Sequence, residues 1–394
     1  GTALENKSDV VKNIEVSGGN ITVTYKDDST DTATISSVVR NNTKPTVDIE
    51  YSDPAPDKKE VYVYASEVNT FDIKIKDDSG KIASAELKRG SNQAFKDVAG
   101  ETNKQDTQYG FTANKITAET TATAENPAVI TYTGTPAPEG AFTQTRLEEV
   151  TRGENPPGIA LGWRFVNALD KDGLDARGNG RDATDPTAVN VILKAQTNKY
   201  DITVPATEDK VTVADPAAVT DAEFEKVKDK LKIEFSKTNP DKRLESKRGQ
   251  NVDDKDDRIS TITKVGNDLV VTYKDGSVDK KSLAELTKLD KQPAIDAVNT
   301  AATEKIAAIN ATPNATDEEK AAAVAKVNAD KTAALTAIND ATTKTTLDTA
   351  KESGTTAISA DNPVVAKKDA AKADVETARK AKEDAIKANP NLTQ

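Results

Sequence analysis

The sequence predicts a multidomain protein in which an all-β region precedes an all-α region. Every aromatic side chain lies between Tyr25 and Tyr273, whereas the remainder is rich in Ala, Lys, Asp, Glu and Thr. Near residue 285 the spacing of apolar residues also changes, from alternation to a helical period. With 394 residues the chain is long enough for roughly two to four domains.

The β region is predicted from short runs in which apolar and polar residues alternate. Phe71, Ile73 and Ile75 fall on one face of such a run, and Asp72 and Lys74 fall on the other. Similar alternation occurs in EVYVYA (60–65), AVITYT (128–133) and AVNVIL (188–193). Because turns rich in Gly, Pro and Asp separate these runs, we expect a β-sandwich.

The α region shows apolar residues at helical spacing from about residue 294, namely Ile295, Val298, Ala302, Ile306 and Ile309. Pro313 can end this helix. Thr316 and Glu319 then have the spacing of a capping box that opens the next helix. Alanine-rich seams pack closely and bury little area, so we expect a slender helical rod.

Two internal repeats support this division. VTYKDDS (23–29) recurs as VTYKDGS (271–277), each time at the end of an expected strand, which indicates a small β module present twice. In the α region, INATPN (309–314) matches IKANPN (386–391), 77 positions later. The last residues of the chain therefore belong to the start of a second helical repeat.

The composition argues against several functional classes. The chain has no His and no Cys, which removes the usual general base and the usual zinc ligands, so we expect neither an enzyme nor a cofactor. A net charge of −11 disfavours nucleic acid. No apolar run approaches the roughly 20 residues needed to cross a membrane.

Alternating carboxylates in the segment DKDGLD (170–175) are compatible with calcium ligation. The spacing differs from that of an EF-hand, because the glycine comes two positions early and no closing glutamate follows. We expect a solvated loop here and no metal site.

The chain has no initiator methionine, signal peptide or wall-anchor motif. We therefore expect a piece of a longer, extracellular protein. The lack of Met and Cys suits such exposure, because these side chains are the most easily oxidised.

Residues 289–394 resemble the helical repeats that form stalks in very large wall-anchored surface proteins of Gram-positive bacteria. The resemblance rests on NATPNATDEEKAAA, AINDATT and AKESGTTAI. It implies one helical stalk repeat at 289–365 and the start of the next at 366–394.

The rest of the chain resembles the binding region of streptococcal sialic-acid adhesins, in which a Siglec-like V-set immunoglobulin domain precedes a small β/α "Unique" domain. YDITVP, ADPAAVTDAEFEKVKD and DLVVTYKDGSVDKKSLAEL carry the resemblance to the Unique domain. It implies a Siglec-like domain at 44–199 and a Unique-like domain at 200–288, with the tail of a preceding Unique-like module at 1–43.

In that family a strand-F motif of an apolar or aromatic residue, Thr, Arg and a variable residue grips the ligand, and an A-x-D…G-N loop follows. GWRFVNALD (162–170) with Gly178-Asn179 matches this pattern at Arg164. Trp163 stands where the family has threonine, which puts the hydroxyl contact of that threonine in doubt.

Alternation along this strand predicts that Trp163 and Phe165 fill the sandwich with Leu161 and fix the strand, while Arg164 points outward. A planar guanidinium fits the sialic-acid carboxylate through two hydrogen bonds. The alternative is that Arg164 forms an ion pair with a neighbouring carboxylate.

A second candidate is VTRG (150–153), which fits the family pattern literally and would place Thr151 and Arg152 at the ligand. The turn sequence ENPPG (154–158) follows it and cannot continue as a paired strand. Thr145-Arg146 is a weaker third candidate, because an arginine on a strand face explains it.

The resemblance implies a bacterial adhesin that binds terminal sialic acid on host glycans and glycoproteins, as a monomer displayed in many copies. It also implies a place at the bacterial cell surface, with anchoring through parts absent from this sequence. Loops at about 88–106, 134–158 and 170–186 would set its selectivity. Two alternatives stay open: an adhesin for a matrix protein such as fibronectin, bound at an exposed strand edge, and a passive stalk segment.

Overall fold

The computed structural model describes residues 5–39, 41–89, 111–136 and 158–390. The chain divides into two compact units. The first is mainly β and takes in residues 1–201, 234–260 and 273–278. The second takes in residues 202–233, 261–272 and 279–394, and it contains the long helices.

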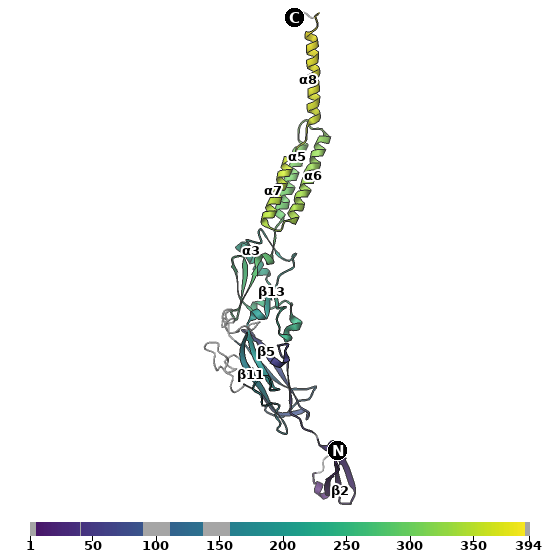
Figure 1. Ribbon diagram of the computed structural model, residues 1–394, viewed down its shortest axis with the longest axis vertical. Coiled ribbons are helices and arrows are strands. Elements are labelled where there is room, and N and C mark those ends of the chain that lie inside the picture. The colour runs from purple at the N-terminus through teal and green to yellow at the C-terminus, as the bar shows by residue number, and fades with distance from the viewer. Residues whose placement is uncertain (1–4, 40, 90–110, 137–157, 391–394) are drawn as a thin grey trace. The chain divides into compact units, whose positions relative to one another are not determined.

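The predicted β-sandwich is present within residues 44–199, where β5 and β11 are labelled in Figure 1. One sheet has the order β4 (Thr46–Ile49), β6 (Asn69–Lys76), β10 (Ala128–Gly134), β8 (Phe111–Ala113). The other has the order β5 (Glu60–Tyr64), β12 (Ala188–Lys194), β11 (Gly158–Asp170), β7 (Lys81–Arg89), β9 (Thr120–Thr121). This immunoglobulin-like architecture confirms the fold class expected for the β region. β4 and β5 lie in different sheets, so the chain changes sheets between residues 49 and 60, through η2 (Pro56–Lys58).

The hydrophobic core lies between the two sheets because alternate residues of each strand face inward. In β6, Phe71, Ile73 and Ile75 are buried and the residues between them are exposed, as the alternation predicts. The other three predicted runs fall on β5, β10 and β12. The branched side chains with no exposed area in this core are Val61, Val63, Ile73, Ile75, Ile82, Ile130, Val166, Val189, Val191 and Leu193.

The N-terminal residues form a separate small meander, in which β2 is labelled in Figure 1. Its elements are η1 (Lys7–Asp9), β1 (Val11–Ser17), β2 (Asn20–Tyr25), β3 (Thr30–Thr34) and α1 (Ile35–Val38). The strands pair antiparallel in chain order.

Residues 196–289 form short strands and helices, as expected for a small β/α module. The elements are η4 (Gln196–Asn198), β13 (Tyr200–Ile202), β14 (Val211–Val213), α3 (Asp221–Lys230), β15 (Ile233–Phe235), η5 (Lys242–Lys247), η6 (Lys255–Asp257), β16 (Ile259–Val265), β17 (Asp268–Tyr273), β18 (Val278–Ser282), α4 (Leu283–Leu286) and β19 (Thr287–Leu289). β14 pairs parallel with β19.

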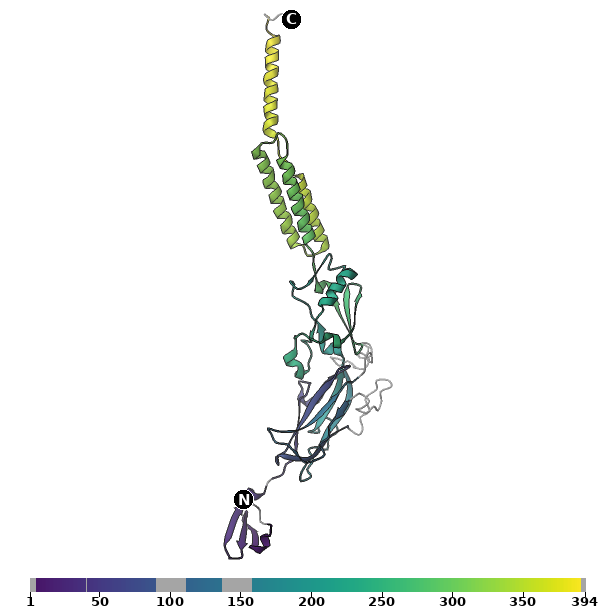
Figure 2. The same cartoon turned by 180° about the vertical axis from the view of Figure 1, so that it is seen from behind.

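Four long helices complete the chain: α5 (Gln292–Asn310), α6 (Asp317–Asp340), α7 (Lys344–Ala360) and α8 (Ala366–Lys387). Figure 2 shows α5, α6 and α7 side by side. Val298, Ala302 and Ile309 of the predicted seam are buried in this bundle. The predicted capping box is confirmed, because Thr316 Oγ1 accepts from the Glu319 amide and the Glu319 carboxylate accepts from the Thr316 amide. None of the described helices combines the length and the apolar character that crossing a membrane requires.

Candidate functional site

Strand β11 lies in the middle of the five-stranded sheet and carries the motif predicted to hold the ligand. Its pairing with β12 shifts register between Ala160 and Gly162, which marks a β-bulge. Gly162 has a φ of 92°, a conformation that favours glycine. Beyond this bulge Arg164 lies opposite Val189 on β12 and opposite Arg89 on β7.

The predicted outward phase of Arg164 is wrong. Val166 and Ala168 belong to the sandwich core, and Arg164 lies on the same face of β11, since residues two apart in a strand share a face. The Arg164 side chain has no exposed area. The bulge at Gly162 explains the error: it changes the phase of the strand, so that Leu161 before it and Val166 after it both face the core.

The buried guanidinium of Arg164 is bound by the main chain of its own strand. Its Nη1 donates to the carbonyl oxygens of Leu161, Gly162 and Trp163, at 3.2, 3.0 and 3.1 Å. These bonds stabilise the bulge, because they join three consecutive carbonyls at the bulge to one buried, charged donor.

The two aromatic residues of the motif lie on the opposite, outer face of β11 rather than in the core. Phe165 is nevertheless buried, and the guanidinium of Arg177 lies 4.6 Å from the centre of its ring. Trp163 is the next outward residue along the strand and is half-buried. Trp163 and Phe165 are therefore successive residues of this face, about 7 Å apart, and the Arg177 guanidinium lies over the second of them.

Two carboxylates, those of Asp170 and Asp175, accept hydrogen bonds from the loop after β11 and so fix the loop that carries Arg177. Asp170 Oδ1 accepts from the amides of Asp172 and Leu174, both at 2.8 Å. Burial acts to raise the pKa of Asp170, but these amides and the Asn42 side chain outweigh it and keep that pKa below the ordinary value. Asp175 Oδ1 accepts from the Arg177 amide, and its Oδ2 accepts from Asn167 on the outer face of β11.

The carboxylates of this loop therefore bind the main chain, which agrees with a structured loop between strands. Within the described ranges, no group of three or more Asp or Glu side chains is arranged to hold a metal ion. Thr151, Arg152 and Arg146 lie outside the described residues, as do most of the predicted loops at 88–106 and 134–158. The ligand roles of Arg164, Trp163, Phe165, Thr151 and Arg152 stay predictions.

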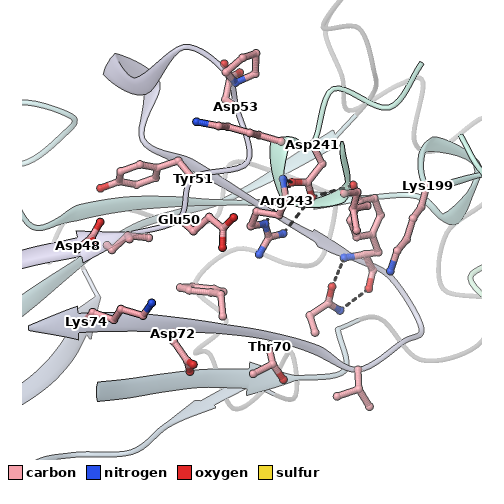
Figure 3. A pocket seen from close by; sticks show the side chains of 18 residues that line it. Asp48, Glu50, Tyr51, Asp53, Thr70, Asp72, Lys74, Lys199, Asp241 and Arg243 are labelled. Carbon is pink, nitrogen blue, oxygen red and sulfur yellow. Dashed lines mark hydrogen bonds and ion pairs between the residues drawn. The ribbon is translucent and has the colours of Figure 1, made fainter. Parts of the chain in front are cut away.

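A cleft with a volume of about 850 Å³ lies where the chain changes sheets between β4 and β5. Figure 3 shows that Glu50 and Arg243 project toward its middle. Arg243 is fixed by the buried Asp241 carboxylate at 3.1 Å and by the carbonyl oxygen of Tyr62. Burial, together with the charge of Asp241, raises the pKa of Tyr64 well above its ordinary value.

One wall of this cleft is an open strand edge. β4 pairs with β6 only over residues 73–76, so no described strand pairs this edge of β6 over residues 69–72. Thr46 Oγ1 donates to the Lys76 carbonyl from the β4 side, whereas Thr133 Oγ1 donates to the Asn69 carbonyl from the β10 side. Because carbonyls of alternate residues face the same edge, those of Thr70 and Asp72 face the cleft.

Sequence reasoning missed both Arg177 and the cleft. The cationic contact on Phe165 depends on where a loop folds back, and no local pattern reports that. A signal for the bulge was present in Gly162, since an isolated glycine within a strand pattern favours a bulge.

A protein-family model matches the helical part of the chain. Residues 290–366 match the family described as Domain of Unknown Function (DUF1542), which confirms a helical repeat of that kind in this segment. None of the curated proteins compared with the chain matches it.

This chain is similar to two solved structures of streptococcal adhesins. The SrpA adhesin from Streptococcus sanguinis is 18% identical, with a TM-score of 0.38 over 64% of this chain and 96% of that one. The sialic-acid-binding region of the Streptococcus sanguinis SK1 adhesin, bound to 3'sLn, is 21% identical, with a TM-score of 0.39 over 70% of this chain and 56% of that one.

Proposed function

We propose that the chain is part of a bacterial surface adhesin whose immunoglobulin-like sandwich binds sialylated glycans without catalysis, while the helical repeats display it. The observation that carries this proposal is the outer face of β11, where a half-buried Trp163 precedes Phe165 and the Arg177 guanidinium lies over the Phe165 ring. An indole face suits the apolar face of a sugar ring, and a guanidinium suits a carboxylate.

Arg177 is better placed than Arg164 to bind the carboxylate. The Arg177 side chain is 31% exposed, and its nearest carboxylate oxygen, on Asp185, lies 3.6 Å from Nε. Arg164 would first have to leave three carbonyl oxygens and the core face of the sheet. Breaking these hydrogen bonds would reduce the net free energy of ligand binding at Arg164, and binding at Arg177 does not require that step.

Binding at such a site is expected to be weak, because a glycan must lose the water bound to its many hydroxyl groups before any net gain. Display of many copies on one cell would compensate through avidity. Arrays of sialylated and desialylated glycans test the proposal with the whole chain. Binding that requires sialic acid is the expected result, and equal signals from both arrays would exclude it.

A second function is favoured by the open edge of β6. An extended peptide of a host matrix protein would continue β4 by pairing with Thr70 and Asp72, as in other cases of strand addition. Thr70→Pro removes one amide from this edge, and on the β10 side it removes only the bond between the side chains of Thr70 and Thr133 at 2.8 Å. If a matrix-protein peptide binds at this edge, the variant should lose binding to matrix protein and keep its binding to glycans. A chain that binds neither glycan nor matrix protein would be a passive stalk.

A further inference from the structure

The N-terminal meander is a structural copy of residues 255–286, at an offset of 248 positions. Each element has a counterpart: η1 with η6, β1 with β16, β2 with β17, β3 with β18, and α1 with α4. Main-chain bonds outside the ladders also recur. The Lys26 amide donates to the Val10 carbonyl at 2.9 Å, and the Lys274 amide donates to the Arg258 carbonyl at 2.9 Å.

The turn after the central strand has the same internal geometry in both copies. Ser29 Oγ and its amide donate to Asp27 Oδ1 at 2.6 and 3.0 Å. Ser277 Oγ and its amide donate to Asp275 Oδ1 at 2.6 and 2.9 Å. Both turns therefore present one further carboxylate oxygen and one serine oxygen in the same arrangement.

In the second copy these two atoms bind the segment that leaves the sandwich. Asp275 Oδ2 accepts from the Gln196 amide at 2.7 Å, and Ser277 Oγ accepts from the Thr197 amide at 3.3 Å. Asp275 and Ser277 have no exposed area. The turn thus caps two successive amides directly after β12.

An aromatic contact extends this interface. The ring of Tyr273 lies 6.2 Å from that of Tyr200, which in turn lies 5.4 Å from Phe235. The Tyr200 hydroxyl donates to Glu67 Oε2 of the sandwich at 3.0 Å. The partner of the turn therefore includes the sandwich itself, which fixes Tyr200 in position.

The corresponding face of the first copy is exposed. Asp27 and Ser29 are exposed, whereas their counterparts are fully buried. Tyr25 is half-buried and donates its hydroxyl to Asp31, whereas Tyr273 has no exposed area. The first copy keeps the surface of the second, but none of the described residues covers it as Gln196, Thr197 and Tyr200 cover the second.

We infer that this face of the N-terminal meander is a docking surface for a second immunoglobulin-like sandwich and the segment that follows its last strand. The partner is a unit built like residues 44–254, with two amides that match those of Gln196 and Thr197 and a ring that matches that of Tyr200. Asp27 and Ser29 accept from the two amides, and Tyr25 packs against the ring. The inference is independent of the proposed ligand.

A duplicated chain tests this docking, with residues 44–254 joined directly to residues 7–394. The junction keeps the register, because Lys7 is the counterpart of Lys255. Hydrogen exchange of the amides in residues 11–34 should slow by about tenfold or more relative to the original chain, since docking buries them. Equal exchange in the two chains would overturn the inference.

The double variant Asp27→Ala with Ser29→Ala is the matched control. It should restore fast exchange in the duplicated chain and leave the exchange of the original chain unchanged. If the double variant leaves the slow exchange of the duplicated chain unchanged, the turn at Asp27 and Ser29 does not hold the docked partner. If the duplicated chain does not fold, replacing residues 255–286 by residues 7–38 in the original chain gives a second test. Slow exchange of the transplanted strands supports the inference, and fast exchange refutes it.

Discussion

The guanidinium of Arg177 lies 4.6 Å from the ring centre of Phe165, on the outer face of the strand that carries the predicted binding motif. The contact lies against a buried aromatic side chain, and it fixes the planar fork of donors over the ring of Phe165. Arg177 is therefore a structural residue of this face, and the proposed function would make it a binding residue as well.

Arg177→Lys keeps the positive charge and loses the fork, so we expect affinity for sialylated glycans to fall by about tenfold, or about 1.4 kcal/mol. Binding can be followed by the fluorescence of Trp163, the single tryptophan of the chain. Arg181→Lys, on the same loop, is the matched control and should retain full affinity. Unchanged affinity in the Arg177 variant would assign the carboxylate to another arginine.

Arg164→Glu is expected to unfold the sandwich rather than to abolish binding alone. The change puts a carboxylate against three carbonyl oxygens on the core face, and the lost charge-assisted bonds cost at least about 2 kcal/mol. Thermal unfolding measured by circular dichroism should show a marked fall in Tm. The Tm of the Arg164→Lys variant should fall less, because lysine keeps a charged donor for the carbonyl oxygens.

The result that contradicts this expectation is informative. A folded Arg164→Glu chain that has lost only its glycan affinity would place the guanidinium at the ligand, as the sequence motif implied. Arg152→Glu complements this comparison, because VTRG fits the family pattern literally. Loss of binding in that variant alone would assign the site to residues 150–153.

The sequence contains enough information for the strands and helices, because their patterns are local. The alternation in residues 71–75 places Ile73 and Ile75 in the core, and the spacing of Thr316 and Glu319 gives the observed capping box. The binding face was not predictable in the same way. A single extra residue at the bulge reverses which side chains of β11 face outward, and the position of Arg177 depends on a loop closed by Asp170 and Asp175.

The boundary expected at residue 288 cuts an observed strand. β19 runs from Thr287 to Leu289, and the Asp290 amide donates to the Val213 carbonyl at 2.8 Å. A chain of residues 44–290 should therefore fold without the helices and bind soluble glycan with unchanged affinity. A chain of residues 44–286 should be less stable, because β14 loses its partner. Circular dichroism and denaturant unfolding compare the two, and equal stability would show that β19 is dispensable.

Gly354 in α7 allows a close approach to α6. A Cβ placed on Gly354 would lie 2.3 Å from the Cβ of Ala334, which neither backbone can accommodate without moving. Gly354→Val should therefore destabilise the bundle by about 1 to 3 kcal/mol. Ser353→Val is the control, since Ser353 is exposed on the same helix and its replacement should change stability little. Equal unfolding midpoints in the two variants would mean that the helices separate at no cost.

Tyr51 should make stability depend on pH in the alkaline range. Burial, with a smaller contribution from Asp48, raises the pKa of Tyr51 to about 12, and its hydroxyl donates to the Ala188 carbonyl at 2.9 Å. In the unfolded chain the pKa of tyrosine is about 10. The folded state thus favours the neutral phenol, and this contribution is complete below pH 10 and is lost as the pH rises toward 12.

Tyr51→Phe separates this contribution from that of the other buried tyrosines. Below pH 10 the variant should be less stable by about 1 kcal/mol, because it lacks the bond to Ala188. As the pH rises from 10 to 12 the original chain should lose stability more steeply, so the gap between the two narrows. Urea unfolding across this range measures the gap. A gap that stays constant would mean that Tyr51 ionises at the same pH in the folded and unfolded chains.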